Sequence, residues 1–173
     1  ETKKGLEKGL EKIVIAGDKL ETRDIRKSSK EFKEAVYRDL EDLKARISES
    51  KAKWIALLAS GKLALDAAAV NSNLENIEIM LPELSEIAKI IDTCYGNISA
   101  YPNMNLYDVK TVCEEFAAQQ KIIKATEFDP KFKAVDQLLS ESVAARTKLE
   151  QRIADKEANE HADSFMATPK LGV

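Results

Sequence analysis

Histidine occurs only once in this sequence of 173 residues, at His161. General acid–base catalysis and hydrolytic triads depend mostly on histidine, and a di-metal carboxylate bundle would need two Glu-x-x-His motifs. His161 lies in a polar segment near the C-terminus, which is typical of a solvent-exposed helix face. A glycine-rich phosphate-binding loop is also missing. The sequence therefore predicts a protein that is not an enzyme and that carries no metal or cofactor.

Long hydrophobic runs and strongly basic stretches are missing too. No apolar run reaches about 18 residues, the length needed to span a membrane, and the most apolar stretch, Trp54 to Val70, is interrupted by polar residues. The formal charge is −3, with both signs interleaved along the chain. Nucleic-acid binding usually needs a basic stripe. We therefore expect neither a membrane span nor a nucleic-acid partner.

Residues that break helices are scarce, because the chain has six glycines and four prolines, whereas 33% of its residues are charged. A composition rich in Ala, Lys, Glu and Leu is typical of long helices and coiled coils. A chain of this length can bury about 70% of its unfolded surface without a metal or a disulfide. The composition predicts a single all-α domain over residues 1–173.

Apolar positions recur in alternating steps of four and three residues in two segments. These steps average 3.5 residues, the period of a helix that keeps one seam against partner helices. We expect both ladders to be buried faces of long helices. The first ladder is Val36, Leu40, Leu43, Ile47, Ser50, Trp54 and Leu57, and the second is Phe128, Phe132, Val135, Leu139, Ser142, Arg146, Leu149 and Ile153.

The first predicted break lies at Gly17-Asp18, which would end a short N-terminal helix or arm over residues 1–17. A long helix then begins between Thr22 and Ser28. Gly61 either ends this helix or bends it, and the following alanines favour continuation to Val70.

Further boundaries come from turn residues later in the chain. Asn71-Ser72-Asn73 is the firmer predicted break, because Ser72 and Glu75 form a capping box. Pro82 either kinks the next helix or starts a new one. Residues 95–104 have the composition of a loop. Asp129-Pro130 is the clearest helix start, with an N-cap followed by proline.

These boundaries predict an elongated up-down helical bundle of four to five helices over residues 20–165, with a frayed tail at 166–173. Short connections make neighbouring helices antiparallel. The start of the first long helix and the end of the last would then lie at one end, where both overhang the shorter middle helices. We expect them to form a coiled-coil-like stalk there, covered by residues 1–16 or by a second protomer.

The two cysteines, Cys94 and Cys113, flank the predicted loop. An even count permits a disulfide in an oxidising compartment. The two residues are staggered along antiparallel helices, however, and bridging needs Cα atoms closer than about 7 Å. A disulfide and two buried thiols both stay open as alternatives.

Asn97-Ile98-Ser99 is an N-glycosylation sequon in the same region. Such tripeptides also occur by chance. Together with the cysteine pair, the sequon tilts the localisation slightly toward secretion and away from the cytoplasm. The compartment itself is left open.

Candidate binding residues surround the predicted loop and the Trp54 seam. Tyr95, Tyr101 and Tyr107 either cap helix ends or face a partner, because tyrosine is favoured in recognition surfaces. We expect a non-enzymatic interaction protein that binds a protein partner, or a second copy, through the stalk or the 95–107 loop. One alternative is a lipid carrier with an apolar pocket at Trp54, Leu58, Leu81 and Leu84. An intracellular coiled-coil scaffold is another.

Overall fold

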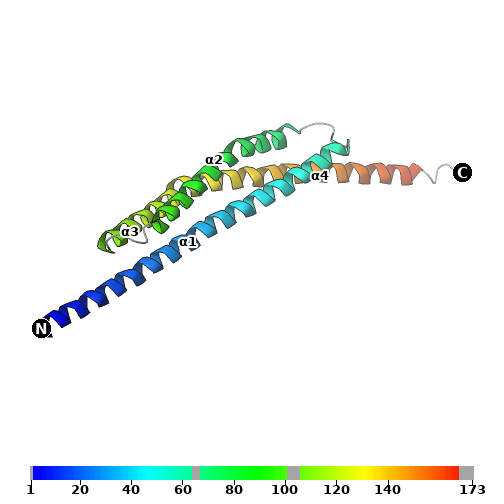
Figure 1. The fold of residues 1–173 in the computed structure, drawn as a ribbon. Helices are drawn as coiled ribbons and strands as arrows, with labels where there is room; N and C mark the ends of the chain where they lie inside the picture. Colours follow the sequence, from blue (N-terminus) through cyan, green and yellow to red (C-terminus); the bar gives the residue numbers. More distant parts are fainter. Residues whose placement is uncertain (1, 64–66, 101–105, 168–173) are drawn as a thin grey trace. The chain divides into compact units, whose positions relative to one another are not determined.

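The computed structural model describes the backbone of residues 2–63, 67–100 and 106–167, and the side chains of residues 22–63, 67–100 and 109–162. Nearly all of these residues are helical (Figure 1). The helices are α1 (Thr2–Ala59), α2 (Ala68–Ser99), α3 (Leu106–Ile123) and α4 (Asp129–Ala167), with a π-helical turn η1 (Lys124–Phe128) between the last two. No strand occurs in these ranges. The expected all-α class is confirmed.

The long first helix corrects the expected break near the N-terminus. Residues 1–17 form no separate helix, because Gly17 and Asp18 lie inside α1. A glycine inside a helix costs about 1 kcal/mol relative to alanine. Helix propagation is cooperative, so a cost of this size does not interrupt a helix of 58 residues.

The end of α1 corrects the expectation that the helix continues through Gly61. α1 ends at Ala59, and Gly61 has a φ of 70°, a left-handed conformation that glycine adopts without steric cost. The Gly61 N–H donates to the Leu58 carbonyl at 3.2 Å. The Ser60 hydroxyl donates to the Leu57 carbonyl at 2.6 Å. Both bonds use carbonyl groups that the ending helix would otherwise leave without partners.

Helix α2 runs through the break expected at Asn71–Asn73 and through Pro82, where a kink and a new helix start were both open. Asn71 to Asn73 lie inside it, so the break predicted there is wrong, and Pro82 is also interior. α2 is thus one helix rather than two. It also includes Tyr95 and Gly96 and ends at Ser99, so the predicted loop starts too early. Residues 101–105 lie outside the described residues.

Asp129 does not start a new helix as expected, because η1 joins α3 directly to α4. Ile123 and Asp129, which flank η1, both have right-handed helical backbone angles, and the Asp129 N–H donates to the Lys124 carbonyl. This bond spans five residues and is that of a π turn. Such a turn inserts one extra residue into the helical repeat just before Phe128, which is buried.

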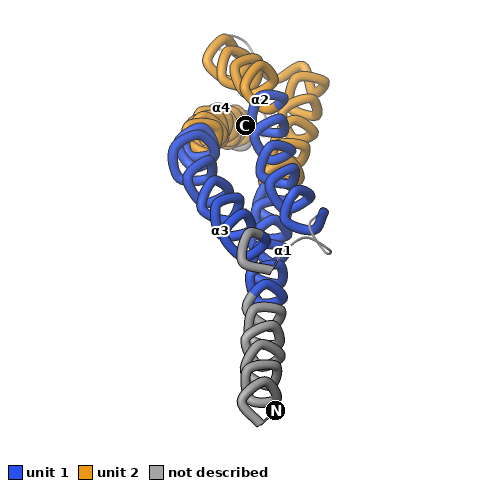
Figure 2. The backbone as a smooth tube through the Cα atoms, turned by 60° about the vertical axis from the view of Figure 1, so that its left-hand side comes forward, with its two compact units in different colours: residues 1–42, 82–133 blue, residues 43–81, 134–173 orange. Residues whose placement is uncertain are grey.

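The chain divides into two compact units (Figure 2): unit 1 contains residues 1–42 and 82–133, and unit 2 contains residues 43–81 and 134–173. In unit 1, Ile25 of α1 packs against a cluster formed by Ile98, Val109 and Cys113. The Gln120 amide donates to the carbonyls of Ser29 at 3.1 Å and Ile91 at 3.4 Å. In these contacts, the residue numbers rise along α1 and α3 while they fall along α2. Helix α2 is therefore antiparallel to both α1 and α3.

Unit 2 has the same up-down-up order, with α4 as its third helix. Trp54 bonds to Asn71 and Lys51 to Glu78, so α1 and α2 are antiparallel there. Arg46 pairs with Asp136, and Arg146 bonds to Ser50 further along both helices. α1 and α4 therefore run parallel. The sequence had predicted the first and last long helices to be antiparallel, and that direction is wrong because η1 removes one reversal of the chain.

Both ladders are confirmed as the buried seam. In the first, every position is buried except the half-buried Leu57, and in the second only Phe132 and Ile153 are half-buried. Arg146 is the charged member of the seam. Its guanidinium donates to the carbonyl of Ser50 at 3.2 Å and to the hydroxyl of Ser50 at 3.1 Å, and its Nε lies 3.3 Å from the Glu150 carboxylate.

Candidate interaction surfaces

A groove between α1 and α2 in unit 2 has Trp54 at its base, and we call it the tryptophan groove. Its volume is 270 Å³, and its lining consists of Lys51, Trp54, Ile55, Leu58, Asn71, Leu74, Glu75 and Glu78. The Trp54 side chain is only 3% exposed. Its indole N–H donates to the Asn71 side-chain oxygen at 2.8 Å. This bond satisfies the one polar atom of the indole and links the two helices.

Two aliphatic side chains beside Trp54 face solvent. Ile55 is 64% exposed and Leu58 is 43% exposed. At the rim of the groove, the Lys51 ammonium pairs with the Glu78 carboxylate at 2.6 Å. Glu75 is exposed and forms no ion pair with any residue whose side chain is described. The tryptophan groove is therefore an apolar surface with an acidic rim.

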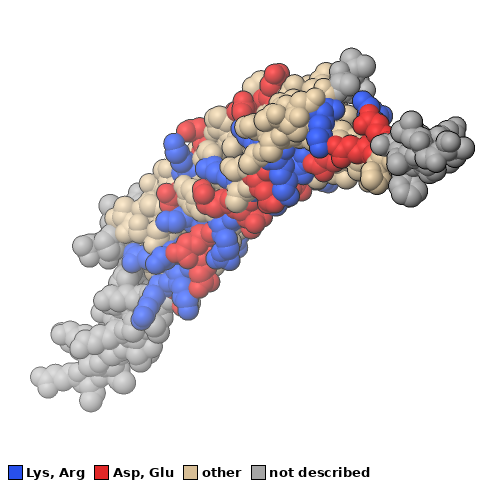
Figure 3. Space-filling view, turned by 90° about the vertical axis from the view of Figure 1, so that its right-hand side faces the viewer, with Lys and Arg blue, Asp and Glu red and all other residues tan. Residues whose placement is uncertain are grey.

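A second groove, the basic groove, lies between α1 and α2 in unit 1. It has a volume of 480 Å³, and its lining consists of Arg23, Asp24, Arg26, Lys27, Lys30 and Tyr95. The spacing from Arg23 to Lys30 places the cations on one side of α1. On the face drawn in Figure 3, Lys and Arg side chains lie among Asp and Glu side chains.

Tyr95 is held in place by a small network that joins α1 and α2. The Lys33 ammonium lies 4.7 Å from the centre of the Tyr95 ring, a cation–π contact. The same ammonium pairs with the Asp92 carboxylate at 3.1 Å. Burial and the Asp92 carboxylate both raise the pKa of Tyr37 above its ordinary value. The contacts of Lys33 with Asp92 and with the Tyr95 ring thus hold the Tyr95 side chain against α1.

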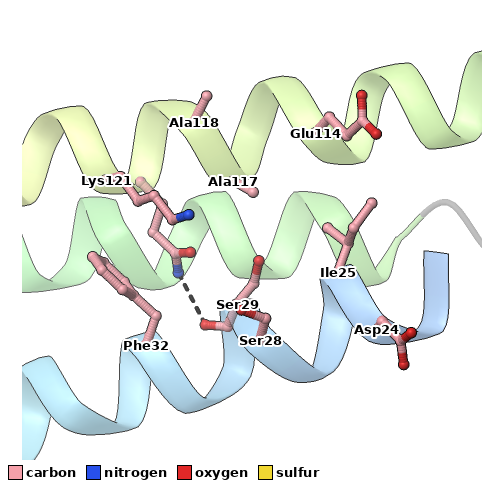
Figure 4. Close-up of a pocket in the computed structure, with 10 residues that line it drawn as sticks. Asp24, Ile25, Ser28, Ser29, Phe32, Glu114, Ala117, Ala118 and Lys121 are labelled. Atoms are coloured by element: carbon pink, nitrogen blue, oxygen red, sulfur yellow. Dashed lines mark hydrogen bonds between the residues drawn. The ribbon is translucent and has the colours of Figure 1, made fainter. Parts of the chain in front are cut away.

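A third groove, of 470 Å³, lies between α1 and α3 in unit 1 (Figure 4). Gln120 closes part of it, because its amide donates to the Ser29 carbonyl, the bond dashed in Figure 4. Ser28, Phe32, Ala117 and Ala118 also line it. The groove holds Asp24, Glu114 and Lys121 as its charged residues and so lacks a dominant sign.

The two cysteines are free and buried in unit 1. Burial raises the pKa of both thiols, and nearby Arg26 partly offsets this at Cys113. Cys113 contacts the carbonyl of Ile98, one helical turn beyond Cys94, with a distance of 3.8 Å from Sγ. Because Cys113 lies opposite Ile98, it is displaced from Cys94 by about one turn along α2. The structure has two thiols rather than a disulfide, in line with the stagger expected from the sequence.

The remaining predicted residues are distributed as follows. Asn97 is half-buried inside α2, and its glycosylation stays a prediction. Tyr101 and the side chain of Tyr107 lie outside the described residues, so the three tyrosines are not shown as one cluster. His161 is exposed. Among the described residues, no three His, Cys, Asp or Glu side chains converge as metal ligands would, and no helix is long and apolar enough for a transmembrane span.

The four residues expected to form an apolar pocket do not all line one groove. Trp54 and Leu58 line the tryptophan groove of unit 2. Leu81 is half-buried, and Leu84 belongs to unit 1 and is completely buried. None of the described grooves includes Leu81 or Leu84 in its lining.

The sequence prediction missed two sets of surface residues. Ile55 is off the four-three ladder, so the ladder does not single it out. Arg23, Lys27 and Lys30 are spaced by four and three residues, but the interleaved charges along the chain predict only a mixed charged surface there. Tyr95 joins these cations in one groove only because α2 packs against α1, and the sequence does not show which residues of the two helices lie opposite each other.

Comparisons with known proteins do not place the chain in a family. No family model matches the sequence, and neither the curated proteins nor the solved structures include a similar protein.

Proposed function

We propose that this chain is a non-enzymatic protein-interaction module that binds a helical segment of a partner protein in the tryptophan groove. The exposure of Ile55 and Leu58 beside Trp54 carries the proposal. Neighbouring exposed apolar side chains are typical of protein-binding surfaces, and the buried Trp54 lines the same groove. The stalk predicted from the sequence is not part of this proposal.

The spacing of the lining residues favours a helix as the bound segment. α1 contributes positions 51, 54, 55 and 58, and α2 contributes positions 71, 74, 75 and 78. Each set follows one face of its helix, so the groove runs between two antiparallel helices. An amphipathic helix fits such a groove through its own apolar face. The Glu75 carboxylate at the rim favours a basic residue beside that face.

Site-specific photocrosslinking tests the proposal with a matched pair of positions. Ile55 is 64% exposed and lines the groove, whereas Ile79 is 67% exposed in the same unit and does not line it. A photoreactive residue at position 55 should crosslink to one partner protein in an extract of the source cells. The same residue at position 79 should not do so.

Mapping the crosslinked peptide completes the test. We expect an amphipathic helical sequence, and we expect the additional substitution Leu58→Glu to abolish the crosslink while the far-ultraviolet circular dichroism stays unchanged. Equal crosslinking at positions 55 and 79 would contradict the proposal. So would native mass spectrometry that shows a bound fatty acid released by Leu58→Glu, because that result would favour the lipid carrier.

A further inference from the structure

The basic groove concentrates positive charge on a chain of opposite net charge. Its lining contains four cationic residues and one carboxylate, which gives +3 from +4 and −1. The whole chain has a formal charge of −3. A local positive field on such a chain steers negatively charged partners toward one site and disfavours contact elsewhere.

Several of these cations are available to a ligand. Arg23 and Lys27 are exposed, and neither forms an ion pair with another residue whose side chain is described. The Lys30 ammonium lies 4.0 Å from the Glu34 carboxylate, with about half of each side chain exposed. An exposed pair at that distance contributes little stability. Among the described side chains, a ligand carboxylate at Arg23, Lys27 or Lys30 would therefore displace only the weak contact between Lys30 and Glu34.

Tyr95 adds a fixed recognition group from the neighbouring helix. One face of its ring is in contact with the Lys33 ammonium, and the pairing of Lys33 with Asp92 holds that ammonium in position. A ring that is already held loses little conformational freedom on binding, which favours affinity. The cations of α1 and the ring of α2 thus form one surface.

We infer that the basic groove binds an acidic helical segment of a partner protein. This inference rests on the proposed interaction function and adds a second contact with its own chemistry. Arg23 and Lys30 are seven residue steps apart on α1, with Lys27 between them, which is about 10 Å along the helix axis. Glutamates at positions i, i+4 and i+7 of a bound helix span the same length, so each would meet one cation.

The surroundings of the groove favour a short acidic segment over a nucleic acid. Glu31, Glu34 and Asp92 lie close in sequence to the lining residues, and their carboxylates would repel the next phosphates of a continuous polyanion. A nucleic acid also needs a longer basic track. A segment with three carboxylates is short enough to end within the positive region.

Nuclear magnetic resonance of the full ¹⁵N-labelled chain tests the inference. The probe is a synthetic helical peptide with glutamates at i, i+4 and i+7, and the control peptide carries glutamines there. We expect the glutamate peptide to shift the amide signals of residues 23–30 and of Tyr95, and to lose this effect as salt is added. No shifts with the peptide at millimolar concentration, or equal shifts with the glutamine peptide, would overturn the inference.

Matched charge reversals give the second arm. Lys27→Glu with Lys30→Glu should weaken binding of the glutamate peptide about tenfold or more, since two attractive contacts become repulsive. The pair Lys133→Glu and Lys148→Glu makes the same change in net charge at exposed positions outside the groove and should leave binding unchanged. Equal weakening by both pairs would contradict the inference.

Two further outcomes separate this inference from its alternatives. A single-stranded oligonucleotide that binds more tightly than the glutamate peptide, and that the Lys27 and Lys30 reversals release, would replace the acidic segment by a nucleic acid. Photocrosslinking that captures a partner at position 55 while the peptide test fails would reject the basic groove and leave the proposed function standing.

Discussion

Units 1 and 2 are built from the same helix order, yet each has a different polar residue in its seam. Unit 1 has Gln120, whose neutral amide bonds to backbone carbonyls of both α1 and α2. Unit 2 has Arg146, whose charge is partnered by Ser50 and by Glu150. A polar residue in a helical seam fixes the register of the helices at some cost in stability. Unit 1 therefore fixes its helix register with a neutral side chain, and unit 2 does so with a charged one.

The two units also differ in the chemistry of their surface grooves, and each groove matches the chemistry of the partner proposed for it. The tryptophan groove of unit 2 is apolar around Trp54, whereas the separate basic groove of unit 1 is cationic beside Tyr95. One pair of helices thus presents two kinds of chemistry. What changes along the pair is the set of side chains outside the buried seam.

The largest expected effect comes from truncating the phenylalanine that follows the π turn. Phe128 is 2% exposed and stacks on Phe132, with ring centres 5.7 Å apart. Phe128→Ala should lower the free energy of unfolding by about 3–5 kcal/mol, because it leaves a cavity. Urea denaturation measures this. The half-buried Phe132 is the matched control, and an equal loss with Phe132→Ala would contradict the assigned burial.

The two polar seam residues should respond differently to removal. Gln120→Ala should destabilise the chain by about 1–3 kcal/mol through lost hydrogen bonds and packing. Arg146→Met should be neutral or stabilising, because an apolar chain of similar length avoids the desolvation of a buried charge. Thermal and urea unfolding of both variants give the comparison. A larger loss for Arg146→Met than for Gln120→Ala would show that the charged layer contributes more than the neutral one.

Two exposed glycines, one from each unit, should respond with opposite signs. Gly96 lies inside α2, and Gly61 has a φ of 70°; a Cβ at either would meet no atom within 4 Å. Gly96→Ala should stabilise by about 0.5–1 kcal/mol, because alanine favours the helix. Gly61→Ala should destabilise by about 1–2 kcal/mol, because its conformation is left-handed. Differential scanning calorimetry measures both, and a stabilising Gly61→Ala would disprove the left-handed turn.

The smallest effect at neutral pH concerns the thiols of unit 1. Burial raises the pKa of Cys94 and Cys113 above the ordinary value of 9.0. Because the folded state binds the thiol protons more tightly than the unfolded state does, the neutral thiols contribute their full stabilisation below pH 9. This contribution is lost as the pH rises through the pKa of the folded state. The free energy of unfolding should therefore fall above pH 9 in urea titrations. The double variant Cys94→Ala and Cys113→Ala should reduce this fall and should not change the slope near pH 7.

The ladders show how much of the fold could be predicted. Positions such as Leu40 and Val135 repeat at 3.5 residues, and this local pattern is enough to identify the buried face of a helix. The helix ends were less predictable. Ser72 and Asp129 carry good capping signals, yet both lie within continuous helical segments, because packing on both sides of a position outweighs a cap of about 1 kcal/mol.

The candidate grooves were only partly predictable for the same reason. The sequence singles out Trp54 as a seam residue that could line an apolar pocket, and Tyr95 as a residue that either caps a helix end or faces a partner. Ile55, Arg23 and Lys27 were not singled out, because their role depends on which residues of α2 lie opposite them. The sequence contains the spacing within each helix but not the register between helices.

By itself, then, the sequence determined the all-helical class and the faces of the helices that are buried, since both follow from composition and from a period within one segment. The tertiary structure decided where α1 ends, how α3 continues into α4, and which side chains meet in the two grooves. These features depend on contacts between residues far apart in the chain. Their energies become available only when the helices pack.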